Sequence, residues 1–176
     1  MIRVWDPAVR VLHGSLAACV ALAWATTAWL GGWHQRIGWA ALAIVVARIV
    51  WGVVGSRRAR FSDFVVGPGA TWRYARLALA GRAPRHVGHN PLGAWMALAF
   101  FACVAALALT GWLYTTDRFW GDETAERVHL ALAWTIVVMV VVHVVGAVLT
   151  GRHQRENLIA SMVDGMKREA APGDRD

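Results

Sequence analysis

Hydrophobic residues gather in four long runs, and most polar residues lie in the segments between them. The runs cover residues 11–30, 37–54, 92–113 and 128–149. Each is close to the roughly 20 residues that an α-helix needs to cross the hydrocarbon core of a bilayer. The second run is the shortest and contains a charged residue, Arg48. This pattern predicts an all-α integral membrane protein, a four-transmembrane-helix bundle that forms a single membrane domain over residues 1–176.

The composition supports a membrane environment. The chain is 57% hydrophobic and 16% charged, whereas a soluble domain is about half apolar and a quarter charged. The first run could instead be a cleaved signal peptide, since Arg3 and Arg10 precede it. However, it is longer than the apolar part of a typical signal and ends in bulky Trp29 and Leu30 rather than a small-residue cleavage site. We therefore predict a retained helix.

The distribution of positive charge predicts the orientation. Segments 1–10, 55–91 and 150–176 hold fourteen of the 18 Lys and Arg residues, whereas the opposite side holds only Arg36, Arg118 and Arg127. Because cytoplasmic segments are enriched in Lys and Arg, the loop 55–91, the tail 150–176 and both termini are expected in the cytoplasm. Anionic lipid headgroups account for the net charge of +7, so no nucleic-acid partner is needed.

Shorter patterns predict the structure of the polar segments. Residues 71–81 and 155–169 have apolar side chains at helical spacing, which is typical of short amphipathic helices on a membrane surface. Asn90-Pro91 reads as the capping residue and first residue of a helix. The last residues, 171–176, are expected to be disordered.

Four histidines predict a pair of sites stacked across the membrane. His129 and His143 lie fourteen residues apart, about 40° short of four helical turns, so they share one face of the last span about 21 Å apart along its axis. The predicted topology places His34 at the outer level with His129. It places His13 at the inner level with His143. Each level then receives two imidazoles from two different helices.

Two facing imidazoles inside a helical bundle are typical of a six-coordinate b-type haem, with one histidine on each axial side of the iron. Zinc and copper sites usually take three or four ligands with thiolate or carboxylate help, which the spans do not offer. The pattern therefore predicts two b haems, an inner one held by His13 and His143 and an outer one held by His34 and His129. Arg48, fourteen residues after His34, either pairs with a haem propionate or extends to the inner headgroups.

Several segments resemble the bacterial cytochrome b561 family, which includes the cytochrome b subunits of nickel–iron hydrogenases. The matching segments are 4–16 with His13, 34–55 with His34 and Arg48, 59–65, 88–93, the His129–His143 pair, and 155–168. The resemblance covers nearly the whole chain and implies a four-helix bundle with two b haems in a bacterial inner membrane. It also implies electron transfer between the quinone pool and a redox partner, either cytochrome c or a membrane-associated oxidoreductase.

The remaining functional assignments stay open at this point. His89 and His153 are candidates for a quinone or proton relay at the inner side, although loop histidines are more often simply solvated.

One branch of the family resembles a superoxide oxidase, but the outer loop 115–127 has four acidic residues against two arginines and would repel an anion. A histidine-lined metal transporter would favour broken helices, and no span contains an internal proline. A purely structural membrane anchor would leave the histidine pairs without a role. Whether the chain is itself an enzyme or only an electron carrier is not decided by the sequence.

Overall fold

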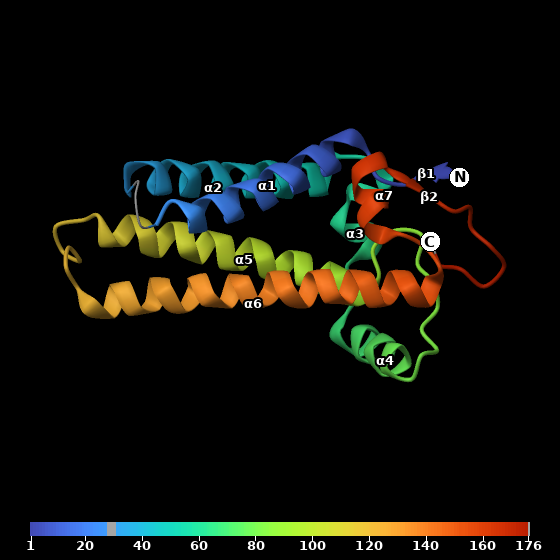
Figure 1. The fold of residues 1–176 in the computed structure, drawn as a ribbon. Coiled ribbons are helices and arrows are strands. Elements are labelled where there is room, and N and C mark those ends of the chain that lie inside the picture. Colours follow the sequence, from blue (N-terminus) through green and yellow to red (C-terminus); the bar gives the residue numbers. More distant parts are fainter. Residues whose placement is uncertain (28–30, 176) are drawn as a thin grey trace. The chain divides into compact units, whose positions relative to one another are not determined.

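The computed structural model is almost entirely helical, and it describes residues 1–27 and 31–175 (Figure 1). Four helices are long and apolar enough to cross a membrane: α1 (Pro7–Ala25), α2 (Gly31–Val54), α5 (Pro91–Tyr114) and α6 (Glu123–Gln154). The predicted membrane fold with four spans is confirmed. The far end of the predicted first span, including Trp29 and Leu30, lies outside the described residues, as does Asp176.

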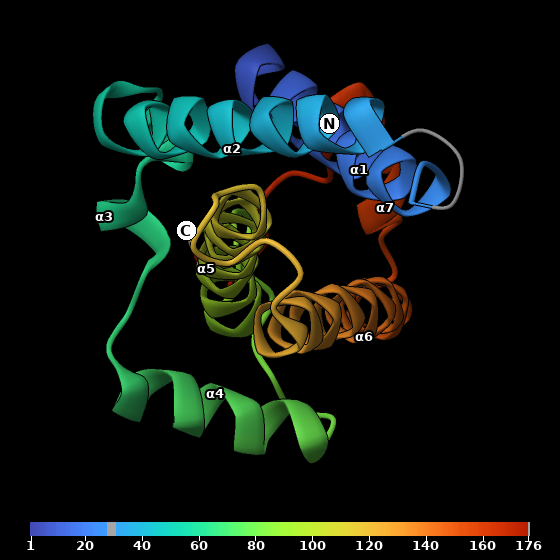
Figure 2. The ribbon, with the colours of Figure 1, turned by 90° about the vertical axis from the view of Figure 1, so that its left-hand side faces the viewer.

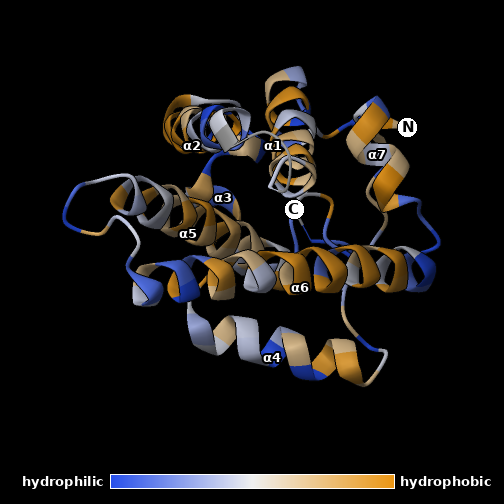
Figure 3. Ribbon diagram, turned by 60° about the vertical axis from the view of Figure 1, so that its left-hand side comes forward, coloured by the Kyte–Doolittle hydropathy of each residue, from blue (hydrophilic) through white to orange (hydrophobic). Residues whose placement is uncertain are grey.

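The long helices present apolar side chains to their surroundings. In each hydrophobic window at most 22% of the residues are buried. Figure 3 shows hydrophobic residues along most of α5 and α6, with hydrophilic residues at the ends of α6. Since water would penalise so large an apolar surface, these helices are suited to a lipid environment.

Residue contacts divide the chain into two compact units. Unit 1 comprises Met1–Arg10, Val50–Leu98 and Val141–Asp176, and unit 2 comprises Val11–Ile49 and Ala99–Val140. Unit 1 therefore contains both termini and the long loop, which were predicted to share one side of the membrane. The single-domain organisation stays a prediction, because each long helix contributes residues to both units.

The core of unit 2 draws on all four long helices. Its buried members are Ala41, Val45, Cys103, Val104 and Ile136, and α1 contributes partly buried residues such as Leu16 and Cys19. Within this unit, Figure 2 shows the ends of α1 and α2 on one side and those of α5 and α6 on the other. Trp24 of α1 packs edge-on against Trp134 of α6, with ring centroids 5.1 Å apart. Unit 2 is thus a four-helix arrangement with a continuous apolar core.

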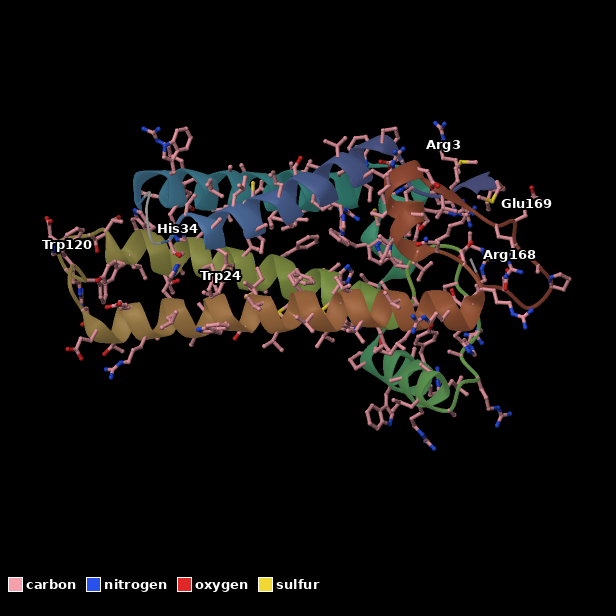
Figure 4. The ribbon with its side chains drawn as sticks, viewed as in Figure 1. Arg3, Trp24, His34, Trp120, Arg168 and Glu169 are labelled. Carbon is pink, nitrogen blue, oxygen red and sulfur yellow. The ribbon has the colours of Figure 1, made fainter. Side chains whose placement is uncertain are left out.

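Unit 1 is built from segments that are far apart in sequence. Its core consists of Val4, Trp5, Val9, Ala59 and Val87. The short strands β1 (Ile2–Arg3) and β2 (Met166–Lys167) pair antiparallel. The rest of the unit includes the 3₁₀-helix η1 (Arg57–Ala59) and the helices α3 (Phe61–Phe64), α4 (Pro68–Leu79) and α7 (Leu158–Asp164). Figure 4 labels Arg3, Arg168 and Glu169 in this unit.

Capping residues set where several helices begin. Asp6 precedes Pro7, and its carboxylate accepts a hydrogen bond from the backbone N–H of Val9 and another from Trp51 Nε1. Burial alone would raise the pKa of Asp6, but these bonds and one from Ser56 outweigh it and lower the pKa. Asn90 caps α5 as predicted, because its side chain accepts from the N–H of Gly93 at 2.8 Å.

Two of the shorter sequence predictions need correction. The helix expected over residues 155–169 is shorter, because Asn157 caps α7 and Gly165, at φ 82°, ends it in the left-handed region. Residues 166 and 167 then form β2. The tail 171–175 was expected to be disordered, yet the N–H of Arg175 bonds the carbonyl of Arg85 and its own carbonyl accepts from Val87. Pairing with the loop orders this tail. The amphipathic helix expected over 71–81 is present as α4, beginning three residues earlier.

A buried ionic cluster joins the loop to the tail. Arg85, which is 6% exposed, contacts Glu156 at 2.9 Å and also donates to Asp174. Lys167 is 3% exposed, lies 4.0 Å from Glu156 and places its ammonium 5.3 Å from the ring of Trp5. Burial lowers the pKa of Lys167 to about 8 from 10.5, in spite of the opposing attraction of Glu156. Holding this charge in the cluster therefore costs stability.

Replacing Lys167 by Met should stabilise unit 1 at neutral pH. The pKa of Lys167 is about 8 in the folded protein against 10.5 in the unfolded chain. Between pH 8 and pH 10.5 the unfolded wild type therefore binds more protons than the folded one. The stability of the wild type rises with pH over this range. At pH 7 the lost penalty, in which the attraction of Glu156 is already included, is worth about 3 kcal/mol. We expect a higher melting temperature for the variant in detergent at pH 7, and a difference that shrinks as the pH approaches 10.5. A difference that does not change with pH would contradict this assignment.

Candidate haem site

Two histidines from different helices meet in unit 2. His34 lies in the first turns of α2 and His129 in the second turn of α6, and both are half-buried. Their ring centroids are 6.1 Å apart and their planes cross at 75°. Figure 4 labels His34, on the part of α2 that belongs to this unit, and Trp24 of α1. The predicted outer pair is therefore brought together.

Each ring of this pair is held through its Nδ1 atom. His34 Nδ1 lies 2.9 Å from the carbonyl oxygen of Ala23 in α1. A carbonyl can only accept, so this nitrogen carries the proton. His129 Nδ1 lies 2.9 Å from Thr110 Oγ1 of α5. The single hydroxyl proton of Thr110 is within reach of the Ala106 carbonyl at 2.9 Å, which leaves an oxygen lone pair to accept from His129. Protonation at Nδ1 leaves Nε2 of both rings as the lone-pair nitrogen that binds a metal.

Helix α5 contributes to this site although it has no histidine. A Cβ atom added to Gly111 would lie 3.3 Å from His129 Cε1, so the glycine lets α6 bring the ring close to α5. Thr110 precedes this glycine and binds the ring. Neither residue was predicted from the sequence. A hydroxyl residue next to glycine in an otherwise apolar span was the available signal.

The spacing of the two rings suits a shared iron. An imidazole nitrogen binds a first-row metal at about 2.0 Å and its ring centre lies about 1.1 Å behind it, so two axial imidazoles place their ring centres roughly 6 Å apart. The observed 6.1 Å matches this value. Within the described residues there is no group of three or more His, Cys, Asp or Glu side chains that could hold a metal ion. Two imidazoles at this spacing fit a haem better than a multi-ligand site for zinc or copper.

The other predicted site residues are located separately. His13 lies on α1 in unit 2 and His143 on α6 in unit 1, and both side chains are exposed in this chain. Because they belong to different units, their pairing stays a prediction. Arg48 lies on α2 in unit 2 and is only 8% exposed. A buried guanidinium is difficult to reconcile with the alternative that it extends to the headgroups.

The two candidate relay histidines have different surroundings in unit 1. The ring of His89 lies between Trp5 and Phe64, with centroid distances of 4.6 and 4.3 Å. His89 also lines a cavity of about 190 Å³. His153 is exposed near the end of α6, next to Arg152, which lines a second cavity of about 330 Å³. The structure therefore brings the two histidines into different settings rather than a common site.

Membrane-length helices that bring two imidazoles together are typical of membrane proteins that bind haem. The model of the family "Prokaryotic cytochrome b561" matches residues 4–165. The chain belongs to the prokaryotic cytochrome b561 family. It is accordingly a membrane-bound b-type cytochrome, the class of protein that binds haem b.

Curated relatives carry the name "Probable Ni/Fe-hydrogenase B-type cytochrome subunit". The one from Azotobacter vinelandii is 28% identical over 76% of this chain and 66% of its own length. The one from Cupriavidus necator is 28% identical over 70% of this chain and 61% of its own length. The chain thus spans slightly less than two thirds of the length of these relatives. No solved structure matches it.

Replacing Thr110 by Val should weaken haem binding at the outer pair. The variant keeps the side-chain volume but removes the oxygen that accepts from His129 Nδ1, so the ring loses its orientation. Loss of such a supporting hydrogen bond typically costs 10–100-fold in metal affinity. Titration of haem into the purified apoprotein, followed by absorbance, should show this loss for one of the bound haems. Thr110→Ser keeps the hydroxyl and should bind haem as the wild type does. Equal affinities for Val and Ser would contradict the supporting role.

Proposed function

We propose that this chain carries electrons across the bacterial inner membrane through two b haems, one held by His34 and His129 and the other by His13 and His143. The observation that carries the proposal is the close His34–His129 pair, in which both Nδ1 atoms are engaged, so that the Nε2 atoms would serve as the ligands of an iron. The second pair follows from the fourteen-residue spacing of His129 and His143 and from the predicted position of His13 at the inner level.

The two histidines proposed for each haem determine which type of reaction the site would allow. When bound, haem b supplies a one-electron carrier, Fe(III)/Fe(II). Two histidines would hold each haem and would leave no position for a further ligand, so each site would transfer electrons without performing chemistry on a substrate. His34 and His129 are half-buried in unit 2, and the hydrogen bonds that fix their orientation limit reorganisation when the charge changes. Arg48, buried in the same unit, offers its guanidinium to a haem propionate.

The partners are proposed from chemistry and from the relatives. Both termini and the loop 55–91 are placed in the cytoplasm, because fourteen of the 18 Lys and Arg residues lie in these segments. The relatives are named as subunits of Ni/Fe-hydrogenases, which favours a membrane-associated oxidoreductase as the redox partner of this chain, with a cytochrome c as the second candidate. Electrons pass between this partner and the quinone pool. Superoxide oxidation is disfavoured by the acidic loop 115–127, and metal transport by the absence of a multi-ligand group in the described residues.

The quinone is proposed to bind beside the inner end of α6. The cavity of about 330 Å³ there has an apolar part, formed by Ala147, Val148, Leu158 and Ile159, and a polar part, formed by Arg152, Glu156 and Asn157. An uncharged aromatic headgroup suits such a lining. His153 is exposed and follows Arg152, a lining residue of this cavity, whereas His89 lines the other cavity between two aromatic rings. We therefore take His153 as the relay group.

Alanine at His34 or His129 should remove one haem and leave the other. Each replacement deletes one axial ligand of the same iron, so both variants should lose the same redox wave and keep the same remaining one. A redox titration of the haem absorbance in the purified variants measures this. If His34→Ala and His129→Ala lost different waves, the two residues would not share a haem.

His153→Gln should slow the reduction of the haems by quinol, because glutamine cannot carry the proton released on quinol oxidation. General acid–base groups contribute typically 10²–10⁴-fold, and we expect a decrease of at least tenfold. Stopped-flow absorbance with a soluble quinol measures the rate, and reduction by dithionite should be unchanged. His89→Gln is the matched control and should react at the wild-type rate. The reverse result would place the quinone in the cavity beside His89.

A further inference from the structure

The smaller of the two cavities described in unit 1 has more basic than acidic side chains in its lining. Its volume is about 190 Å³, and it lies between the segment around η1 and the residues that lead into α5. The side chains that give it its chemistry are Arg57, Arg58, Asp63, Phe64, His86 and His89. Two guanidinium groups thus outnumber the one carboxylate, and two imidazoles add hydrogen-bonding nitrogen atoms. The lining is complementary to an anion.

His86 adds a buried nitrogen to this cavity. Its Nε2 atom is buried and makes no hydrogen bond within the described part of the chain. Tyr74 packs edge-on against the ring at 5.3 Å. Burial lowers the pKa of His86, and the nearby charges of Arg175 and Lys167 lower it further, so the imidazole is neutral at pH 7. The same two cations add to the positive field around the cavity.

The cavity lies where a membrane-spanning helix begins. Pro91, which lines it, is the first residue of α5. Val66, another lining residue, accepts a hydrogen bond from Trp95 Nε1 at 3.1 Å, which ties the start of the α4 segment to α5. Lipid headgroups occupy the level at which a spanning helix enters the bilayer.

Helix α4 follows Val66 directly and has the composition of a helix that lies on a membrane surface. Trp72 is 67% exposed and Leu79 is 90% exposed, although both are large and apolar. Arg73 and Arg76 lie on the same helix. Exposed tryptophan and leucine combined with arginine are typical of helices that rest among anionic headgroups.

We propose that this cavity binds the phosphate group of an anionic phospholipid. Guanidinium groups pair with phosphate oxygens through two parallel hydrogen bonds, and the neutral imidazole of His86 can donate one more. An uncharged quinone would gain nothing from this charge. The proposal rests on the membrane topology and is independent of the electron-transfer function.

Lipid binding to the purified haem-containing protein tests the proposal. Delipidated protein in detergent is titrated with phosphatidylglycerol or phosphatidylcholine, and bound lipid is counted by native mass spectrometry. Wild-type protein should bind one phosphatidylglycerol at least tenfold more tightly than phosphatidylcholine. The double variant Arg57→Gln/Arg58→Gln should lose this preference. Arg73→Gln/Arg76→Gln removes the same charge from α4 and should keep it.

Three outcomes would overturn the proposal. Equal losses in the two double variants would show that only the general positive charge matters. Displacement of the lipid by millimolar inorganic phosphate would identify free phosphate as the ligand. An unchanged lipid preference with slower quinol-driven reduction in Arg57→Gln/Arg58→Gln would assign the cavity to the quinone.

His86→Ala is the second variant if the double variant does not fold, and it should weaken lipid binding while both haems are kept. Because lipid is counted directly, the result does not depend on haem number or on electron transfer.

Discussion

The imidazole N–H is the group on which the haem site of this protein depends. In a hydrocarbon environment an unsatisfied polar hydrogen costs several kcal/mol, so each histidine inside the helices needs an acceptor. His34 finds one in the Ala23 carbonyl at the end of α1, and His129 finds one in the Thr110 hydroxyl of α5. Both acceptors engage Nδ1. Because the N–H group at Nδ1 needs an acceptor, the ring adopts the tautomer whose Nε2 has a lone pair and can bind iron. The hydrogen bond that helix packing requires and the orientation that iron binding requires are therefore the same.

This requirement explains why four helices are needed for a pair of ligands. Helices α2 and α6 carry the two histidines, while α1 and α5 supply the acceptors. Gly111 gives α5 the close approach that Thr110 needs. In unit 1, the N-terminal strand, the loop before α5 and the C-terminal tail are joined by β pairing and by the Arg85–Glu156 pair. The polar ends of the chain thus form a compact unit of their own.

The sequence predicted the features that arise from periodicity and hydrophobic length. The four spans and the meeting of His34 with His129 follow from run length, helical spacing and the alternation of direction between consecutive spans. Local capping was also predictable at Asn90, because cap and Pro occur side by side. Contacts between segments distant in sequence were not. The order of the tail depends on Arg85 and Val87, and no local pattern encodes such a pairing. Thr110 was overlooked because a single hydroxyl residue in an apolar helix most often bonds its own backbone, as Thr110 also does.

The direct test of the account is the number and type of haems in the purified protein. The pyridine haemochrome assay gives haem b per polypeptide, and electron paramagnetic resonance of the oxidised protein reports the axial ligands. Two haems per chain, both low-spin ferric with two imidazole ligands, are the predicted result. A single haem, or a high-spin signal from iron with an open axial position, would contradict the paired-histidine account.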